Sequence, residues 1–262
     1  MEDPGTVFFT GTAGAGKTSL VQAFKEWMSH SGYDATVVNL DPGNENPTLE
    51  PDVDVREWVR LPDVMTEYDL GPNGAQVVAS DLIAIKVFEI KQALAEFRSD
   101  LVLVDTPGQV ELFAFRESSK SIVEALGGDQ ATIAFLFDPA LARSPAGFVS
   151  LLLLSASVEF RFRAPMVNLL TKSDLIPPEQ LEEVLAWAEE PGRLSAAVDA
   201  VTPTPDMQLS TQVYRAIELM APMTGLLATS AKDSTGLESV YRAVQRNLGG
   251  GEDLEPAQAP PE

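Results

Sequence analysis

The stretch FFTGTAGAGKTSL, residues 8–20, decides the fold because it joins an apolar strand to a helix through a glycine-rich turn. Glycines let the backbone wrap closely around phosphate, and the helix that follows presents its positive end to the same anion. In the pattern Gly-x4-Gly-Lys-Thr, Lys17 is expected to reach the β- and γ-phosphates and Thr18 to ligate Mg²⁺. We therefore predict a phosphate-binding loop whose nucleotide contacts are Ala13, Gly14, Ala15, Gly16, Lys17, Thr18 and Ser19.

Apolar, β-branched runs alternate with helical patterns along the chain, which is typical of a parallel sheet built from βαβ units. The runs are continuously apolar, as expected of strands buried on both faces. The expected strands are residues 7–10, 36–40, 101–104, 132–137, 166–170 and 226–229. The expected helices are residues 17–29, 82–98, 144–161, 178–190, 207–219 and 237–248. We predict an α/β P-loop NTPase fold, a mostly parallel sheet with helices on both faces.

Two stretches interrupt this alternation: a loop-rich region at about 41–80 and a helical insertion at about 175–225. We expect one P-loop GTPase domain over residues 1–248, followed by a disordered acidic, proline-rich tail over 249–262. The insertion is rich in methionine, which favours core packing but could also form a groove for a protein client.

The composition excludes several classes of function. Of 262 residues, 39 are acidic and 18 basic, and the net charge of −21 repels nucleic acid and anionic membranes. There is no cysteine, which excludes disulfides and thiolate metal sites. No apolar run approaches the ~20 residues of a membrane span, and the N-terminus resembles no signal peptide. We expect a cytoplasmic protein.

A second carboxylate follows the strand in LVLVDTPGQVE, residues 101–111. Asp105 ends this strand at the edge where open α/β sheets bind ligands, so it is expected to hold Mg²⁺ opposite Thr18. Asp41, after the preceding strand, is expected to join the same network of Mg²⁺ and water, and a simple strand-end cap is the alternative.

The residues after Asp105 are candidates for handling the γ-phosphate. The backbone N–H of Gly108 can donate to it and the residue can act as a pivot. Gln109 is placed to orient an attacking water, and Glu111 lies one step beyond. We assign Lys17, Asp105, Gln109 and Glu111 to catalysis.

Two further strand ends predict the base. In VNLLTKSD, residues 167–174, the Asp174 carboxylate can accept both N1–H and N2–H of guanine, while the stem of Lys172 lies along the base. After the last strand, Ser230-Ala231-Lys232 offers a backbone N–H to guanine O6. Together these motifs indicate GTP rather than ATP as the nucleotide.

The whole set of motifs resembles the GPN-loop GTPases, in particular a short, archaeal-like member. The resemblance covers nearly the whole domain and rests on Gly11–Thr18, Asp41, Gly71-Pro72-Asn73, Asp105–Gln109, Thr171–Asp174 and Ser230–Lys232. It implies a homodimer in which the Gly71-Pro72-Asn73 loop reaches into the partner's active site, so Asn73 joins the catalytic candidates. One departure is Thr171, which stands where many GTPases have an asparagine that braces the phosphate loop. That departure concerns nucleotide affinity more than base identity.

The tripeptide Gly71-Pro72-Asn73 could also be a plain surface turn, since these residues favour turns. Pro72 fixes its own φ, which stiffens a loop that must enter another subunit. The neutral amide of Asn73 carries a donor and an acceptor suited to a leaving phosphate or an attacking water. Arg56 is interpreted as the partner of an ordinary ion pair rather than as an arginine finger.

We therefore expect Mg²⁺-dependent hydrolysis of GTP to GDP and phosphate by a nucleotide-switched homodimer that assists the assembly of protein complexes. One alternative is a GTP-binding scaffold or chaperone with little turnover. Another is a P-loop kinase acting on a small molecule. Such a kinase needs a basic lid, and the insertion at 175–225 has only Arg193 and Arg215 as basic residues.

Overall fold

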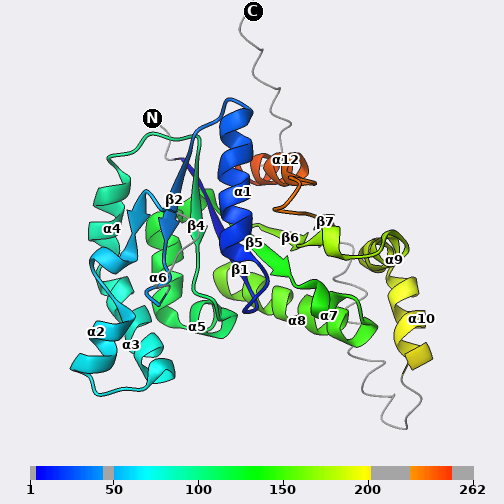
Figure 1. Ribbon diagram of the computed structural model, residues 1–262, viewed down its shortest axis with the longest axis horizontal. Helices are drawn as coiled ribbons and strands as arrows, with labels where there is room; N and C mark the ends of the chain where they lie inside the picture. The colour runs from blue at the N-terminus through cyan, green and yellow to red at the C-terminus, as the bar shows by residue number, and fades with distance from the viewer. Residues whose placement is uncertain (1–3, 44–49, 202–224, 250–262) are drawn as a thin grey trace, which may run out of the picture.

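The computed structural model describes residues 4–43, 50–201 and 225–249 (Figure 1). Within these ranges seven strands form one sheet in the order β3-β2-β4-β1-β5-β6-β7, and all neighbouring strands are parallel. The strands are β1 (Gly5–Gly11), β2 (Ala35–Asn39), β3 (Val53–Asp54), β4 (Leu101–Asp105), β5 (Ala131–Phe137), β6 (Met166–Leu170) and β7 (Leu226–Ala228). The α/β fold with a parallel sheet is confirmed.

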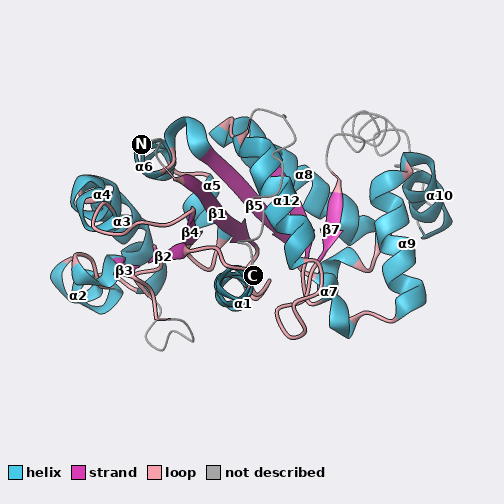
Figure 2. Cartoon of the chain, turned by 90° about the horizontal axis from the view of Figure 1, so that it is seen from above, coloured by secondary structure: helices cyan, strands magenta, loops and turns pink. Residues whose placement is uncertain are grey.

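Helices cover both faces and both ends of this sheet. They are α1 (Lys17–His30), α2 (Leu61–Glu67), α3 (Pro72–Ile85), α4 (Val87–Leu94), α5 (Val110–Ala114), α6 (Glu117–Leu126), α7 (Pro139–Ala142), α8 (Pro145–Phe162), α9 (Pro178–Glu189), α10 (Pro191–Val201) and α12 (Leu237–Leu248). Short 3-10 turns are η1 (Val55–Glu57), η2 (Gly128–Gln130) and η3 (Ser173–Leu175). Figure 2 shows α2, α3 and α4 at one end of the sheet and α9 and α10 at the other.

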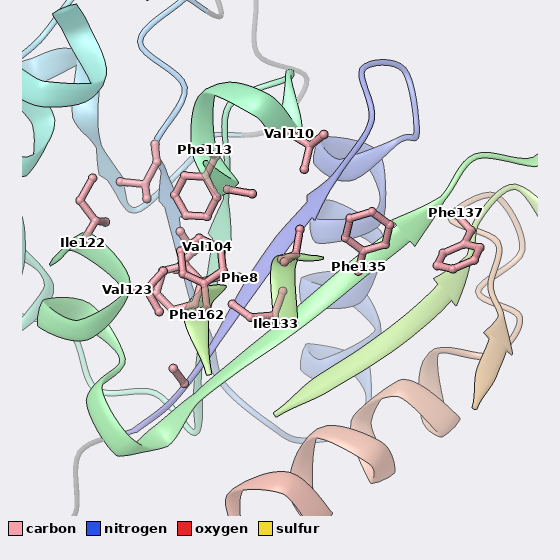
Figure 3. Packing of buried hydrophobic residues seen from close by; sticks show 14 of the residues in the cluster. Phe8, Val104, Val110, Phe113, Ile122, Val123, Ile133, Phe135, Phe137 and Phe162 are labelled. Atoms are coloured by element: carbon pink, nitrogen blue, oxygen red, sulfur yellow. The ribbon is translucent and has the colours of Figure 1, made fainter. Parts of the chain in front are cut away.

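The alternation of side chains along β1 divides the core into two layers. Phe9 packs with Phe24 of α1 and Val244 of α12 on one face. Phe8 points to the other face, where Phe113 of α5 and Phe162 of α8 pack in the same cluster (Figure 3). All seven residues of β1 and of β5 are buried, as expected of central strands of a parallel sheet covered on both faces.

The region at 41–80, expected to be loop-rich, contains regular structure. It holds β3, η1, α2 and the first part of α3. Pro62 and Pro72 lie in the first turns of α2 and α3, where proline has no hydrogen bond to lose and its fixed φ suits a helix. The expectation was wrong because the same residues favour turns and helix starts.

Other boundaries also differ from the expectation. The single helix expected over 82–98 is the end of α3 followed by α4, which stops at Leu94, and Lys86 separates the two. Helices α5, α6 and α7 were not expected. The helix expected over 207–219 and the tail over 250–262 lie outside the described residues. Of the insertion at 175–225, α9 and α10 are described, and the proposed domain boundaries stay a prediction.

Helix α8 is long and apolar enough to span a membrane by length and composition alone, the one such helix in the described ranges. Its apolar character has a local explanation, because Phe148, Leu151 and Val158 are buried in the core beside the sheet. A core helix passes the same test as a membrane span, so this feature identifies no membrane segment.

Candidate functional site

The phosphate loop lies between β1 and α1, at the carboxyl edge of the sheet (Figure 1). Gly16 is the N-cap of α1 and has left-handed backbone angles, φ 90° and ψ 28°, which favour glycine. At Gly11, φ is 156°, and a Cβ atom would lie 2.8 Å from the carbonyl oxygen of Leu136. The glycines at both ends of the loop are therefore required by the backbone. Ala13 and Gly14 are exposed on the loop and Ser19 is exposed in the first turn of α1, whereas Ala15 is buried.

Lys17 crosses the inside of this loop and is only 6% exposed. Its Nζ donates to the carbonyl oxygens of Gly11 at 3.1 Å, Thr12 at 3.2 Å and Gly108 at 2.9 Å. Burial lowers the pKa of Lys17, against the opposing effect of three nearby carboxylates, those of Asp105, Asp41 and Glu111. The ammonium group thus joins the phosphate loop to the segment after β4.

Asp105 and Thr18 meet across the same edge. The Thr18 hydroxyl donates to Asp105 Oδ2 at 2.6 Å. The other oxygen, Oδ1, is buried and has no hydrogen-bond partner in the described part of the chain. Burial is the main reason that the pKa of Asp105 rises to about 6, and the nearby Asp41 carboxylate raises it further. A buried carboxylate oxygen without a partner, beside a hydroxyl, is suited to a hard cation such as Mg²⁺.

Asp41 follows β2, where it caps the turn after the strand and also acts on the charged residues of the site. Its Oδ1 accepts from the Gly43 N–H at 2.9 Å, as a strand-end cap would. Its charge also acts on both Lys17 and Asp105, which places it at the same edge. No cluster of three or more metal-ligating acidic, histidine or cysteine side chains occurs among the described residues. Thr18, Asp41 and Asp105 fit Mg²⁺ of the kind that also takes ligands from water and phosphates.

The segment from Asp105 to α5 approaches the phosphate loop from the side. The Thr106 hydroxyl donates to the Phe9 carbonyl at 2.8 Å and anchors its start. Gly108 is held through its carbonyl by Lys17. Gln109 is the N-cap of α5 and is exposed, as is Glu111 in the first turn of that helix. Both side chains are free of the core, and the charge of Glu111 acts on Lys17.

Thr171 braces the phosphate loop from β6. It is buried, and its hydroxyl donates to the carbonyl of Ala15 at 2.7 Å and contacts that of Phe137 at 3.2 Å. Lys172, with a left-handed φ of 51°, places its Nζ 2.5 Å from the carbonyl oxygen of Gly14. Thr171 therefore braces the phosphate loop, the role that asparagine was expected to have at this position.

The two motifs expected to contact the base lie side by side. Asp174 is exposed on η3, directly after Lys172 and Ser173. The Ser173 N–H donates to the carbonyl of Thr229, so η3 is tied to the end of β7. Beyond β7, the Lys232 N–H donates to Ser230 Oγ at 3.2 Å and forms a tight turn that includes Ala231.

The tripeptide Gly71-Pro72-Asn73 starts a helix instead of forming a loop. Gly71 is the N-cap of α3 and Pro72 its first residue, and all three residues are exposed. No hydrogen bond in the described ranges joins them to the phosphate loop. Helix α3 does pack against α5, the helix that begins after Gln109. Hydrogen bonds join the start of α1 to Asp105 and Gly108 within one chain, and in the described ranges none joins these residues to Asn73.

Three polar residues near the site were not predicted to belong to it: Asn39, Asp54 and Arg56. Asn39 ends β2 and is 4% exposed. Arg56 forms an ion pair with Asp54, in agreement with the ordinary ion pair favoured by the sequence. Burial raises the pKa of Asp54, but hydrogen bonds from Arg56 and Asn39 outweigh burial and hold it below its usual value. In the sequence, the polar side chain of Asn39 at the end of an apolar strand was the signal that could have placed it at the site.

Comparison with known proteins identifies the family. A family model described as "Conserved hypothetical ATP binding protein" matches residues 9–250. The GPN-loop GTPase PAB0955 of Pyrococcus abyssi is 32% identical over 239 residues, which cover 89% of this chain and 93% of that protein. The chain belongs to the GPN-loop GTPase family. A second GPN-loop GTPase, QQT1 of Arabidopsis thaliana, is 36% identical over 170 residues, 63% of this chain and 57% of that protein.

The fold agrees with that of a solved GPN-loop GTPase. The crystal structure of PAB0955, a GTPase in apo form from Pyrococcus abyssi, superposes with a TM-score of 0.81 at 31% sequence identity. The match covers 92% of this chain and 96% of that one. The P-loop NTPase fold is therefore shared over nearly the full length of this GPN-loop GTPase.

Proposed function

We propose that this GPN-loop GTPase hydrolyses GTP to GDP and phosphate in a Mg²⁺-dependent reaction. The observation that carries the proposal is the 2.6 Å hydrogen bond between Thr18 and Asp105, with Lys17 beside it. This bond joins the phosphate loop to the carboxyl end of β4, the two elements that share the metal in P-loop NTPases. Family membership supports GTP as the nucleotide.

The residues supply position and charge. In the reaction, water adds to the γ-phosphorus and the bond to the β–γ bridging oxygen breaks. Lys17 neutralises charge that spreads onto the phosphate oxygens, and Gln109 orients the water. Gly108 donates its N–H to the γ-phosphate, with Glu111 nearby. Mg²⁺, when bound, neutralises the β- and γ-phosphates.

Thr18, Asp41 and Asp105 are the residues that would hold this Mg²⁺, directly or through water. All three contribute oxygen ligands, which Mg²⁺ prefers. Asp105 also has the buried oxygen Oδ1 without a partner in the described residues. A cation there removes the cost of burying this group, which is the physical reason for the fit.

Guanine selection is assigned to Asp174, with Lys172 along the base and the turn at Ser230-Ala231 near O6. Asp174 is exposed on η3 and able to meet a ligand. Asp174→Asn should weaken GTP binding by about 100-fold, because two hydrogen bonds to a charged group are lost, and should favour a xanthine nucleotide. Titration of the wild type and variant with GTP, ATP and XTP measures this. ATP binding as tight as GTP binding in the wild type would overturn the assignment.

We further propose that the protein acts as a homodimer in which Gly71-Pro72-Asn73 reaches the partner's nucleotide. The tripeptide is exposed at a helix N-terminus, whose first N–H groups lack partners within the helix and suit an anion. Its exposure, and the lack of a hydrogen bond in the described ranges to the phosphate loop of its own chain, support action on a second copy.

The nucleotide-switched dimer would assist the assembly of protein complexes in the cytoplasm, with a protein client at the helical insertion. The rival reading as a small-molecule kinase finds little support in α9 and α10. Their basic residue Arg193 is ion-paired with Glu190 at 2.8 Å and offers no phosphate-binding lid.

Single-turnover release of phosphate from GTP tests the hydrolysis directly. We expect release with Mg²⁺ and its loss when EDTA is added. Tight, Mg²⁺-dependent GTP binding without release would instead identify a GTP-binding scaffold. Transfer of the γ-phosphate to a small acceptor, with no free phosphate, would identify a kinase.

A further inference from the structure

The side chain of Asn39 makes two hydrogen bonds to the backbone of Asp41, one to its N–H and one to its carbonyl. Asn39 Oδ1 accepts from the Asp41 N–H at 3.0 Å, and Asn39 Nδ2 donates to the Asp41 carbonyl at 3.2 Å. A primary amide is suited to this because it carries a donor and an acceptor on one planar group. Together the two bonds fix the peptide groups on either side of the Asp41 side chain.

Asn39 is itself held in place. Its Nδ2 also donates to Asp54 Oδ1 at 3.0 Å. Arg56 holds that carboxylate with its backbone N–H at 2.9 Å and with Nε at 2.9 and 3.0 Å. The flat guanidinium group binds both oxygens of Asp54, which fixes the orientation of the carboxylate as well as its charge. Asp54 of β3 and Arg56 of η1 therefore hold the Asn39 amide in the orientation in which it bonds Asp41.

The turn after Asp41 has a second attachment. The Pro42 carbonyl accepts from the Leu61 N–H at 3.0 Å, at the start of α2. The Gly43 N–H donates to Asp41 Oδ1, which orients the carboxylate within the turn. The Asp41 side chain is thus set in position through its neighbours' backbone and through the Asn39 amide.

We propose that Asn39 is a positioning residue of the GTPase reaction, which sets the Asp41 carboxylate relative to Mg²⁺ through the Asn39–Asp54–Arg56 network. This inference rests on the proposed function. A positioning role is favoured over a purely structural one because two of the three hydrogen bonds of the Asn39 side chain go to Asp41. Loss of a group that orients a metal ligand typically lowers metal affinity or activity by about 10- to 100-fold.

The experiment compares Asn39→Ala with a matched loss of a buried asparagine. Asn168 in β6 is 2% exposed and accepts from Ser155 Oγ at 2.7 Å. Because β4, β1 and β5 lie between β6 and β2 in the sheet, Asn168→Ala is the control. Binding of a fluorescent GDP analogue to the full chain is measured over a range of Mg²⁺ concentrations and in EDTA. The midpoint of the Mg²⁺ dependence is the main readout, with kcat and KM for GTP beside it.

For Asn39→Ala we expect the Mg²⁺ midpoint to rise about tenfold, while GDP-analogue affinity in EDTA stays within about twofold of the wild type. The value of kcat should fall by about tenfold with little change in KM. Asn168→Ala should lose thermal stability but keep the wild-type Mg²⁺ midpoint. Equal Mg²⁺ midpoints for the two variants would overturn the inference.

Arg56→Lys keeps the proposal testable if Asn39→Ala does not fold. Lysine retains the charge but cannot bind both oxygens of Asp54, so we expect a smaller rise of the Mg²⁺ midpoint, about threefold. An unchanged midpoint in this variant would also count against the network. A wild type whose nucleotide binding ignores Mg²⁺ would refute the proposed function instead, which separates the two failures.

Discussion

Helices α1 and α3 both begin next to a glycine, and the two beginnings differ completely in their surroundings. At α1, Lys17 is buried and bonds Gly108, and the loop before it accepts hydrogen bonds from Thr171 and Lys172. At α3, Gly71, Pro72 and Asn73 are all exposed, and no side chain caps the helix. Both helix starts offer unpaired N–H groups and a positive dipole end, so both suit an anion.

The difference supports the proposal that one chain completes only part of the site. At the α1 end, the Lys17 ammonium, the Asp105 carboxylate and the bracing residues Thr171 and Lys172 belong to the same chain. At the α3 end, no hydrogen bond in the described ranges joins Gly71-Pro72-Asn73 to the phosphate loop. This contrast is the basis for assigning the first to nucleotide binding and the second to a partner subunit.

The largest expected effect is at the α1 end. Lys17→Ala and Thr18→Ala should each lower the rate of hydrolysis by at least about 10²–10³-fold, because each removes a group that meets phosphate charge or metal. Circular dichroism should show the same helix content as the wild type. If either variant releases phosphate near the wild-type rate, the nucleotide does not bind at the start of α1. The proposed difference between the starts of α1 and α3 would then be wrong.

A smaller effect is expected at the α3 end. Asn73→Ala should lower the rate about tenfold, as for the loss of one neutral hydrogen bond in the transition state, and leave GTP affinity and the dimer intact. Mixing it with Lys17→Ala should restore part of the activity, because a mixed dimer pairs a working pocket with a working tripeptide.

That rescue requires the tripeptide to cross the interface. Native mass spectrometry of the mixture checks that mixed dimers have formed. If they have and no activity returns, Asn73 acts within its own chain or not at all, and α3 has an ordinary exposed start.

The buried carboxylate at the α1 end should make stability depend on pH. In metal-free protein the pKa of Asp105 is raised from 3.8 to about 6, mainly by burial. The folded state therefore binds a proton that the unfolded state has lost between these pH values, and stability falls as pH rises through that window. At about 1.4 kcal/mol per pKa unit, the loss is about 3 kcal/mol above pH 6.

Asp105→Asn should remove this dependence, since the amide does not ionise and can still accept from Thr18. Urea unfolding in EDTA at several pH values compares the two proteins. If the wild type and the variant have the same free energy of unfolding at pH 7, burial of the ionised Asp105 carboxylate does not destabilise the fold.

The smallest expected effect concerns the brace from Thr171. Thr171→Ala leaves the Ala15 carbonyl without its hydroxyl donor and should cost about 1–2 kcal/mol of stability or nucleotide binding. Thr171→Ser keeps the hydroxyl and should retain most of this. If alanine and serine behave alike in nucleotide titrations, the lost methyl group rather than the hydrogen bond is responsible.

The sequence predicted the features that depend on neighbouring residues. The strands around Phe8 and Leu103 were predictable because burial on both faces demands apolar runs, and the phosphate loop because its glycines are fixed by local backbone angles. The start of helix α3 was missed because Pro72 suits a turn and a helix start equally well. The contacts from Thr171 to Ala15 and from Asn39 to Asp54 join residues far apart in the chain, and no local pattern encodes them.

The ammonium of Lys17 has three N–H donors, and it donates to the carbonyl oxygens of Gly11, Thr12 and Gly108. A phosphate oxygen that accepts from this ammonium competes with these carbonyl oxygens for the same donors. One of these bonds holds the carbonyl of Gly108, so the phosphate loop and the segment after β4 are coupled through a single side chain. A change in what Lys17 binds therefore acts on both segments at once.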